Sequence, residues 1–179
     1  TACLAHDLGN PPFGHSGEET ISSYFKDGAG NELQHLIPEQ QWSDLVSFEG
    51  NANAFRQLTH QFKGRRQGGM SLTYASLASL IKYPYPSYDN GNRKKYNVFH
   101  SELDTFVKVM NGCGIKRLDD ERPIFARHPL SYMMEAADDI CYLILDMEDA
   151  HKRGIVRTSE IEHYFTAFFN NENPDEKWF

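Results

Sequence analysis

The sequence contains no apolar run of the roughly 20 residues that a membrane-spanning helix needs, and no signal peptide is visible. We therefore expect no contact with a membrane. Cysteine is scarce as well: Cys3, Cys113 and Cys141 show no Cys-x-x-Cys spacing, and an odd number leaves one thiol unpaired in any disulfide scheme. Free thiols in a reducing cytoplasm are the simplest interpretation, so a cytoplasmic protein is expected.

Basic residues are in deficit, with 18 Lys and Arg against 25 Asp and Glu and a net charge of −7. This balance argues against a protein that coats nucleic acid, because a polyanionic ligand would need a local cluster of Lys and Arg. Hydrophobic residues make up 40% of the 179 residues, which is enough for a core. The length fits a single domain over residues 1–179.

Apolar residues recur at spacings of three and four along most of the chain, and no segment reads convincingly as a strand. Capping boxes are predicted at Ser16 with Glu19 and at Ser101 with Asp104, and Pro129 suits the first turn of the longest helix. The predicted helices cover residues 2–8, 17–26, 43–63, Ser71 or Thr73 to about Tyr83, Ser101 to about Gly112, 129–153 and 159–169, with loops at 27–41 and 84–97. We therefore predict an all-α domain.

The most informative stretch covers residues 2–18. It places His6 beside Asp7, continues through a Gly-Asn-Pro-Pro turn, and brings His15 and Glu18 to the start of a predicted helix. An adjacent His-Asp pair can supply one nitrogen and one oxygen ligand, which suits Mn, Fe, Co, Ni or Zn and suits Mg less well. A bare His-Asp pair is most often incidental, so the whole stretch carries the signal rather than the dipeptide.

The longest predicted helix carries the second signal. Asp138, Tyr142 and Asp146 recur at a spacing of four and therefore share one face of the helix. Asp138 lies among apolar residues, where an unpaired charge is costly, so it needs a partner. That partner is either an arginine in a structural salt bridge or a metal shared with His6 and Asp7, and the spacing does not decide between them.

Three weaker features remain, and the first two carry two interpretations each. Gly50 in Phe-Glu-Gly-Asn51 marks either helix packing or the close approach of another backbone or ligand, since glycine inside a helix costs about 1 kcal/mol relative to alanine. Lys82-Tyr83 at a helix end either meets a phosphate or complements the helix dipole. A small basic cluster, predicted to be a solvated surface loop, consists of Arg93, Lys94 and Lys95.

Several motifs follow one another in a characteristic order: His6-Asp7-Leu-Gly-Asn-Pro-Pro-Phe-Gly-His15-Ser-Gly-Glu18, Phe-Glu-Gly-Asn51-Ala, Lys82-Tyr83-Pro, Arg127-His128-Pro-Leu and Glu-Ala-Ala-Asp138-Asp-Ile-Cys-Tyr142. From residue 2 to about 153 the sequence resembles the deoxyguanosinetriphosphate triphosphohydrolase family of the HD-domain superfamily. The resemblance implies an α-helical HD fold that holds one divalent metal with two histidines and two aspartates. His6 and Asp7 match the central pair of ligands and Asp138 matches the last, and the metal would be Mn, Mg, Fe, Co, Ni or Zn.

The resemblance also implies catalytic and binding roles. His15 and Glu18 match the family's catalytic pair, in which His15 would position or protonate at the scissile phosphate and Glu18 would orient His15. Positions that line the nucleotide pocket are Asn51, Lys82, Tyr83, Tyr142 and Asp146. Lys82 would meet the triphosphate, whereas Tyr142 and Asp146 would meet the sugar.

Family members cleave a dNTP at the α-phosphate and release a deoxynucleoside and intact tripolyphosphate, and dGTP is the first substrate to expect. A homo-oligomer and single-stranded DNA are the partners that the resemblance leaves open.

One part of the family pattern is missing. The first metal-binding histidine of the family lies upstream of the His-Asp pair, whereas this chain begins five residues before His6. The family's C-terminal region, which completes the base end of the pocket, is absent too. We expect the chain to be a fragment of a longer enzyme, which alone binds metal weakly and turns over little substrate.

Two other functions stay open on the sequence. One is an HD phosphohydrolase that acts on another nucleotide, such as a nucleoside monophosphate or a signalling nucleotide. The other is a non-catalytic regulator that binds nucleotide or nucleic acid with the same fold. The joint presence of His6, Asp7, His15, Glu18 and Asp138 argues against the regulator.

Overall fold

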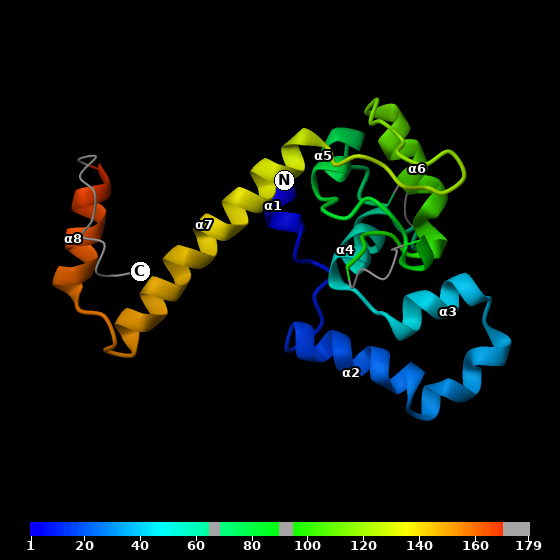
Figure 1. Cartoon of the computed structure of the whole chain (residues 1–179), viewed down its shortest axis with the longest axis horizontal. Helices are drawn as coiled ribbons and strands as arrows, with labels where there is room; N and C mark the ends of the chain where they lie inside the picture. Colours follow the sequence, from blue (N-terminus) through cyan, green and yellow to red (C-terminus); the bar gives the residue numbers. More distant parts are fainter. Residues whose placement is uncertain (65–68, 90–94, 170–179) are drawn as a thin grey trace. The chain divides into compact units, whose positions relative to one another are not determined.

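The computed structural model describes residues 1–64, 69–89 and 95–169, and the chain divides into two units, Thr1–Glu135 and Ala136–Phe179 (Figure 1). Arg93 and Lys94 of the predicted basic cluster lie outside the described residues. Whether the chain forms the single domain predicted for residues 1–179 stays a prediction.

The described residues form helices joined by short connections. In chain order these are α1 (Ala2–Ala5), α2 (His15–Lys26), the 3-10 helix η1 (Ala29–Leu36), α3 (Glu39–Val46), α4 (Gly50–Thr59), α5 (Tyr74–Ser79), the 3-10 turns η2 (Ser87–Asp89) and η3 (His100–Glu102), α6 (Leu103–Gly112), α7 (Pro129–Lys152) and α8 (Thr158–Phe169). Over this part of the chain, extended pairing is limited to two isolated bridges. The all-α prediction is confirmed. The described helices include none that is long and apolar enough to cross a membrane.

The main hydrophobic core of unit 1 lies between α4, α5 and α6. The ring of Phe106 in α6 packs edge-on against Phe55 in α4 and against Phe125, with centroid separations of 6.5 and 5.3 Å. Leu58 extends the same face of α4, one turn beyond Phe55, and is buried. This packing holds α4 firmly, so the first residues of α4 give the site a rigid support.

The helix predicted over residues 43–63 is two helices, because the chain breaks between α3 and α4. Glu49 has an extended backbone, with φ of −135° and ψ of 124°, and its side chain accepts a hydrogen bond from the backbone N–H of Asn51. It therefore acts as the N-cap of α4. Glutamate is not among the preferred N-cap residues, and the apolar period continues across the break. For these two reasons the sequence predicted one continuous helix.

The predicted start of α2 is wrong. The helix begins at His15 rather than beyond Ser16, and its N-cap is Gly14, which makes no side-chain cap bond. Phe13 and Gly14 both have positive φ, 67° and 55°, and turn the chain into the helix. The glycine supplies a conformation that a capping serine would not adopt without strain.

Several other helix boundaries also differ from the prediction. The first helix ends at Ala5 instead of Leu8. Ser101 does not cap α6, because its hydroxyl donates to Glu102 at 2.7 Å within η3. The loop predicted over 27–41 contains η1 and the start of α3. By contrast, Thr73 caps α5, because its side chain accepts a hydrogen bond from the Ser76 backbone N–H. Thr73 was one of the two residues predicted to start this helix.

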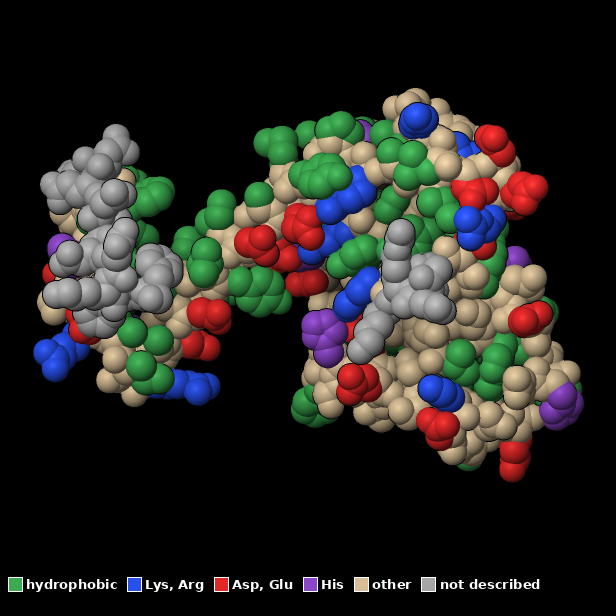
Figure 2. Space-filling view, in the orientation of Figure 1, with side chains coloured by type: hydrophobic (Ala, Val, Ile, Leu, Met, Phe, Trp, Pro, Cys, Tyr) green, Lys and Arg blue, Asp and Glu red, His purple; other side chains and the backbone are tan. Residues whose placement is uncertain are grey.

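Unit 2 contains α7 beyond Glu135 and α8. Helix α7 begins at Pro129 and ends at Lys152, which confirms the predicted helix within one residue. Apolar side chains follow one another along it (Figure 2), and Ile140, Leu143 and Ile144 are all more than half exposed. The uninterrupted apolar run over 140–145 places such side chains on every side of the helix.

Asp44 is a buried carboxylate that ties three elements of unit 1 together. From α3 it accepts hydrogen bonds from the Ser87 hydroxyl in η2 and from the His100 backbone N–H in η3, both at 2.7 Å. Its main-chain carbonyl accepts a third bond, from the hydroxyl of Tyr96 at 3.2 Å. Burial raises the pKa of the Asp44 carboxyl to about 6, because desolvation outweighs these hydrogen bonds.

We expect Asp44 to make unfolding pH-dependent. Its carboxyl loses its proton near pH 4 in the unfolded chain and near pH 6 in the folded one. The folded state therefore gains stability at the acid end of this range, and the free energy of unfolding falls by at most about 3 kcal/mol as pH rises through it. Denaturant unfolding between these pH values measures the slope. Asp44→Asn does not titrate and should lack this component, and equal slopes in the two proteins would contradict the prediction.

Candidate functional site

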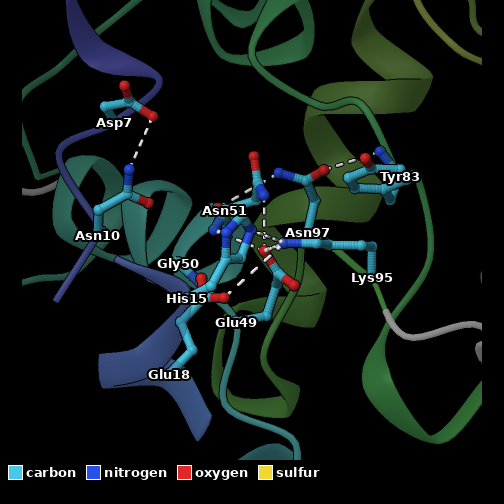
Figure 3. Close-up of polar contacts among 10 residues, drawn as sticks. All are labelled: Asp7, Asn10, His15, Glu18, Glu49, Gly50, Asn51, Tyr83, Lys95 and Asn97. Carbon is cyan, nitrogen blue, oxygen red and sulfur yellow. Dashed lines mark hydrogen bonds and ion pairs between the residues drawn. The ribbon is translucent and has the colours of Figure 1, made fainter. Parts of the chain in front are cut away.

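His6 and Asp7 lie where α1 ends, and local hydrogen bonds orient both side chains. His6 Nδ1 is 2.9 Å from the carbonyl oxygen of Cys3, one turn earlier, and a carbonyl can only accept. Nδ1 therefore carries a proton, and Nε2 is the nitrogen that would bind a metal. Asp7 Oδ1 accepts from the side-chain amide of Asn10 at 2.9 Å (Figure 3), so Oδ2 is the oxygen left to bind.

Nε2 of His6 and Oδ2 of Asp7 are spaced as two ligands of one metal would be. His6 Nε2 and Asp7 Oδ2 are 3.4 Å apart. Nitrogen and oxygen ligands each bind a divalent transition metal at about 2.1 Å, so two neighbouring ligands of one ion lie about 3.0–3.4 Å apart. One nitrogen and one oxygen donor at this separation match the predicted chemistry, and each is already oriented by a partner on its far side.

Helix α7 carries the remaining predicted ligand and the two sugar-binding candidates in unit 2. Asp138 is half-buried, whereas Tyr142 and Asp146 are exposed. All three share one face of α7, as the spacing predicted. It stays a prediction that Asp138 binds the same metal as His6 and Asp7. It also stays a prediction that Tyr142 and Asp146 contact a sugar.

The start of α2 brings the predicted catalytic pair against α4. His15 is exposed, and Glu18 lies one turn further along, with a side chain that is 12% exposed. Glu18 Oε1 accepts a hydrogen bond from the backbone N–H of Gly50 at 2.8 Å (Figure 3). This bond joins two segments 32 residues apart and anchors the carboxylate to the first turn of α4.

Glycine at position 50 makes this contact close enough to form. A Cβ there would collide with the side-chain oxygen of Asn10 and would lie 2.8 Å from Glu18 Oε1. The close contact at Gly50 is thus made by the side chains of Asn10 and Glu18, which corresponds to the packing interpretation and not to another backbone or a ligand. Gly50 is the first residue of α4 rather than an interior residue, so it costs less than the prediction assumed.

Lys95 is a site residue that the sequence analysis missed. Its Nζ lies 3.0 Å from His15 Nε2, 3.4 Å from Glu49 Oε1 and 3.8 Å from Glu18 Oε2 (Figure 3). The expectation that it belongs to a solvated loop is wrong. Because an ammonium group can only donate, Nε2 of His15 accepts this hydrogen bond. Glu18 reaches His15 through Lys95, since both groups contact the same ammonium.

Glu49 and Asn51 complete this part of unit 1. The side-chain amide of Asn51 donates to Glu49 Oε1 at 2.6 Å. Glu49 is 2% exposed, and burial raises the pKa of its carboxyl. The predicted nucleotide contact Asn51 is thus held by a carboxylate to which the sequence analysis gave no role.

Asn97 connects this cluster to the Lys82-Tyr83 segment. Its side chain accepts from the Tyr83 backbone N–H at 2.7 Å and donates to the carbonyl of Asn51 at 3.2 Å. Lys82 and Tyr83 line a groove of about 760 Å³ whose other walls include Arg122, Arg127 and Tyr132. Ligand pockets typically enclose about 300–1,000 Å³, so the groove is large enough for a nucleotide.

Comparison with known proteins confirms the resemblance that the sequence suggested. A deoxyguanosinetriphosphate triphosphohydrolase-like protein of Pseudomonas aeruginosa (strain LESB58) is 44% identical over 98% of this chain and 40% of its own length. A protein of the same name from Synechocystis is 39% identical over 90% of the chain and 39% of its own length. The deoxyguanosinetriphosphate triphosphohydrolase of Yersinia pestis (strain Pestoides F) is 32% identical over 98% of the chain and 38% of its own length.

The chain therefore spans no more than 40% of the length of these relatives. No protein-family model matches the chain.

Proposed function

We propose that this chain is the core of a metal-dependent dNTP triphosphohydrolase of the HD superfamily, and that dGTP is its preferred substrate. The reaction breaks the bond between the α-phosphorus and the 5′ oxygen, and releases a deoxynucleoside and tripolyphosphate. Because the chain spans at most 40% of the matched relatives, the proposal concerns the longer protein of which we propose it is a part.

The observation that carries the proposal is the arrangement around Lys95. One ammonium group lies within 4 Å of both His15 and Glu18, the pair predicted to move protons. A cation beside an imidazole is a suitable place for a phosphate oxygen, because the charge attracts the phosphate while the imidazole handles a proton. The names of the relatives support the same reaction.

His6 and Asp7 would hold the metal, with Asp138 as the third ligand that this chain supplies. A bound divalent metal polarises a phosphate oxygen and lowers the pKa of a bound water. Cys3 and Asn10 keep the two ligands of unit 1 oriented through the bonds described above. Single-stranded DNA and a homo-oligomer stay predictions for the longer protein.

His15 is the group that we assign to proton transfer at the scissile phosphate. Its Nε2 accepts from Lys95 in the absence of substrate. A phosphate oxygen that draws the ammonium of Lys95 toward itself would release Nε2, which would then take up a proton from solvent and donate it to the departing 5′ oxygen. Glu18 stays bound to the Gly50 N–H and would fix the helix turn on which His15 lies.

Product analysis tests the proposal. We expect the full-length protein, supplied with Mn or Mg, to convert dGTP to deoxyguanosine and inorganic tripolyphosphate, with each of the other dNTPs assayed in parallel. Chelation of the metal should remove the activity, because the nucleophile and the phosphate both depend on it. Phosphate or pyrophosphate as the inorganic product would contradict the proposal and favour another HD phosphohydrolase.

A further inference from the structure

A single carboxylate oxygen, Oε1 of Glu49, contacts the side chain of Asn51, the backbone of Asn51 and the side chain of Lys95. Glu49 Oε1 lies 2.6 Å from the side-chain amide of Asn51, 3.4 Å from the Asn51 backbone N–H and 3.4 Å from the ammonium of Lys95 (Figure 3). Asn51 belongs to the first turn of α4, whereas Lys95 lies 46 residues from Glu49 along the chain. The carboxylate therefore links segments that meet only in the folded protein.

The burial of Glu49 is more than an N-cap requires. An exposed serine or aspartate caps a helix without the cost of burying a charge. The cap bond of Glu49 is its weaker one, at 3.4 Å to the backbone N–H, while the short bond goes to the Asn51 side chain. The closest contact of this buried carboxylate is therefore with a side chain and not with the start of the helix.

These contacts determine what Asn51 and Lys95 present to a ligand. One N–H of the Asn51 side-chain amide donates to Glu49, which fixes the plane of that amide and leaves its carbonyl oxygen and its second N–H for a ligand. Lys95 is drawn toward Glu49 on one side and contacts His15 and Glu18 on the other. Without the charge of Glu49, the flexible Lys95 side chain would keep only the more distant carboxylate of Glu18, 3.8 Å away, as a partner of opposite charge.

We propose that Glu49 is a positioning residue of this site: it fixes the plane of the Asn51 side-chain amide, and together with Glu18 it holds the Lys95 ammonium beside His15. The role rests on the proposed function, since its consequence is measured on that reaction. Glu49 itself does not touch the reacting atoms.

Glu49→Gln tests this role because the amide keeps an oxygen that can accept from Asn51 but loses the charge that holds Lys95. We expect kcat/KM for the dNTP to fall by about 10²-fold, the size of loss that small misplacements of site groups produce. Metal affinity, measured by titration calorimetry, should stay unchanged, because none of the contacts of Glu49 reaches His6 or Asp7.

The chain offers a matched control in Glu102. It is also a glutamate at the N-cap of a helix, 5% exposed, and it pairs with Arg56 at 2.7 Å. We expect Glu102→Gln to lower the melting temperature while kcat/KM stays near the wild-type value. Equal losses of activity in both variants, in proportion to their losses of stability, would overturn the positioning role, and so would full activity of Glu49→Gln.

A double-mutant cycle on kcat/KM distinguishes a positioning role of Glu49 from a purely structural one. If Glu49 acts through Lys95, then Glu49→Gln combined with Lys95→Met should be no worse than Lys95→Met alone. Additive losses would overturn the proposal. Wild-type protein that releases no tripolyphosphate from any dNTP would instead contradict the proposed function, and the role of Glu49 with it.

Discussion

Replacing His15 with alanine should lower kcat for dNTP hydrolysis by about 10²–10⁴-fold, the range that one general acid–base group contributes. The Lys95 ammonium lies 3.0 Å from His15 Nε2, and its other partners among the described residues are the carboxylates of Glu49 and Glu18. The exposed His15 side chain adds little packing, so the loss should appear in turnover rather than in stability. Steady-state kinetics of the full-length protein with dGTP would measure it.

The control for this variant is His35→Ala. His35 is also exposed on a helix of unit 1, η1, and has no role in the proposed reaction. Both variants should keep the wild-type melting temperature and metal affinity, since neither histidine is a predicted ligand. Unchanged turnover in His15→Ala would contradict the catalytic assignment, whatever the result for His35.

Local features of the fold could be predicted from the sequence, because local residues determine them. Pro129 and the long apolar period predicted α7, and Thr73 was one of two predicted caps for α5. The break at Glu49 was missed, since the apolar period continues across it and the cap is not a preferred type. Where the start of a helix depends on positive φ, as at Phe13 and Gly14, the capping pattern around Ser16 misled the prediction.

The candidate site was predictable only where its residues are close in sequence. His6, Asp7, His15 and Glu18 lie in one stretch and could be recognised together. Lys95 reaches His15 across 80 residues, so no spacing within the chain announces the contact, and its basic neighbours suggested a solvated loop. Long-range pairs of this kind are fixed by tertiary packing, which a single sequence does not show.

The other large effect that we expect is on stability, from Gly9→Ala. Gly9 is buried where the chain leaves α1, and a Cβ there would collide with the Gly50 carbonyl oxygen and the Ala54 backbone nitrogen of α4. Neither backbone atom can move aside cheaply, so we expect a loss of about 3 kcal/mol or more in the free energy of unfolding. Any displacement of Gly9 that relieves this collision would also break the 2.8 Å hydrogen bond from the Asn53 side chain to the Gly9 carbonyl oxygen. That bond holds the turn after His6 and Asp7 against α4.

Metal affinity should therefore fall together with stability in Gly9→Ala, which chemical denaturation and titration calorimetry would show. Gly114→Ala is the matched control, because Gly114 has a φ of 65° but no atom within 4 Å of its added Cβ, so only the backbone strain of about 1 kcal/mol remains. A Gly9→Ala protein as stable as Gly114→Ala would show that the turn after Asp7 does not need its close contact with α4. The two proposed metal ligands of unit 1, His6 and Asp7, would then be placed by α1 alone.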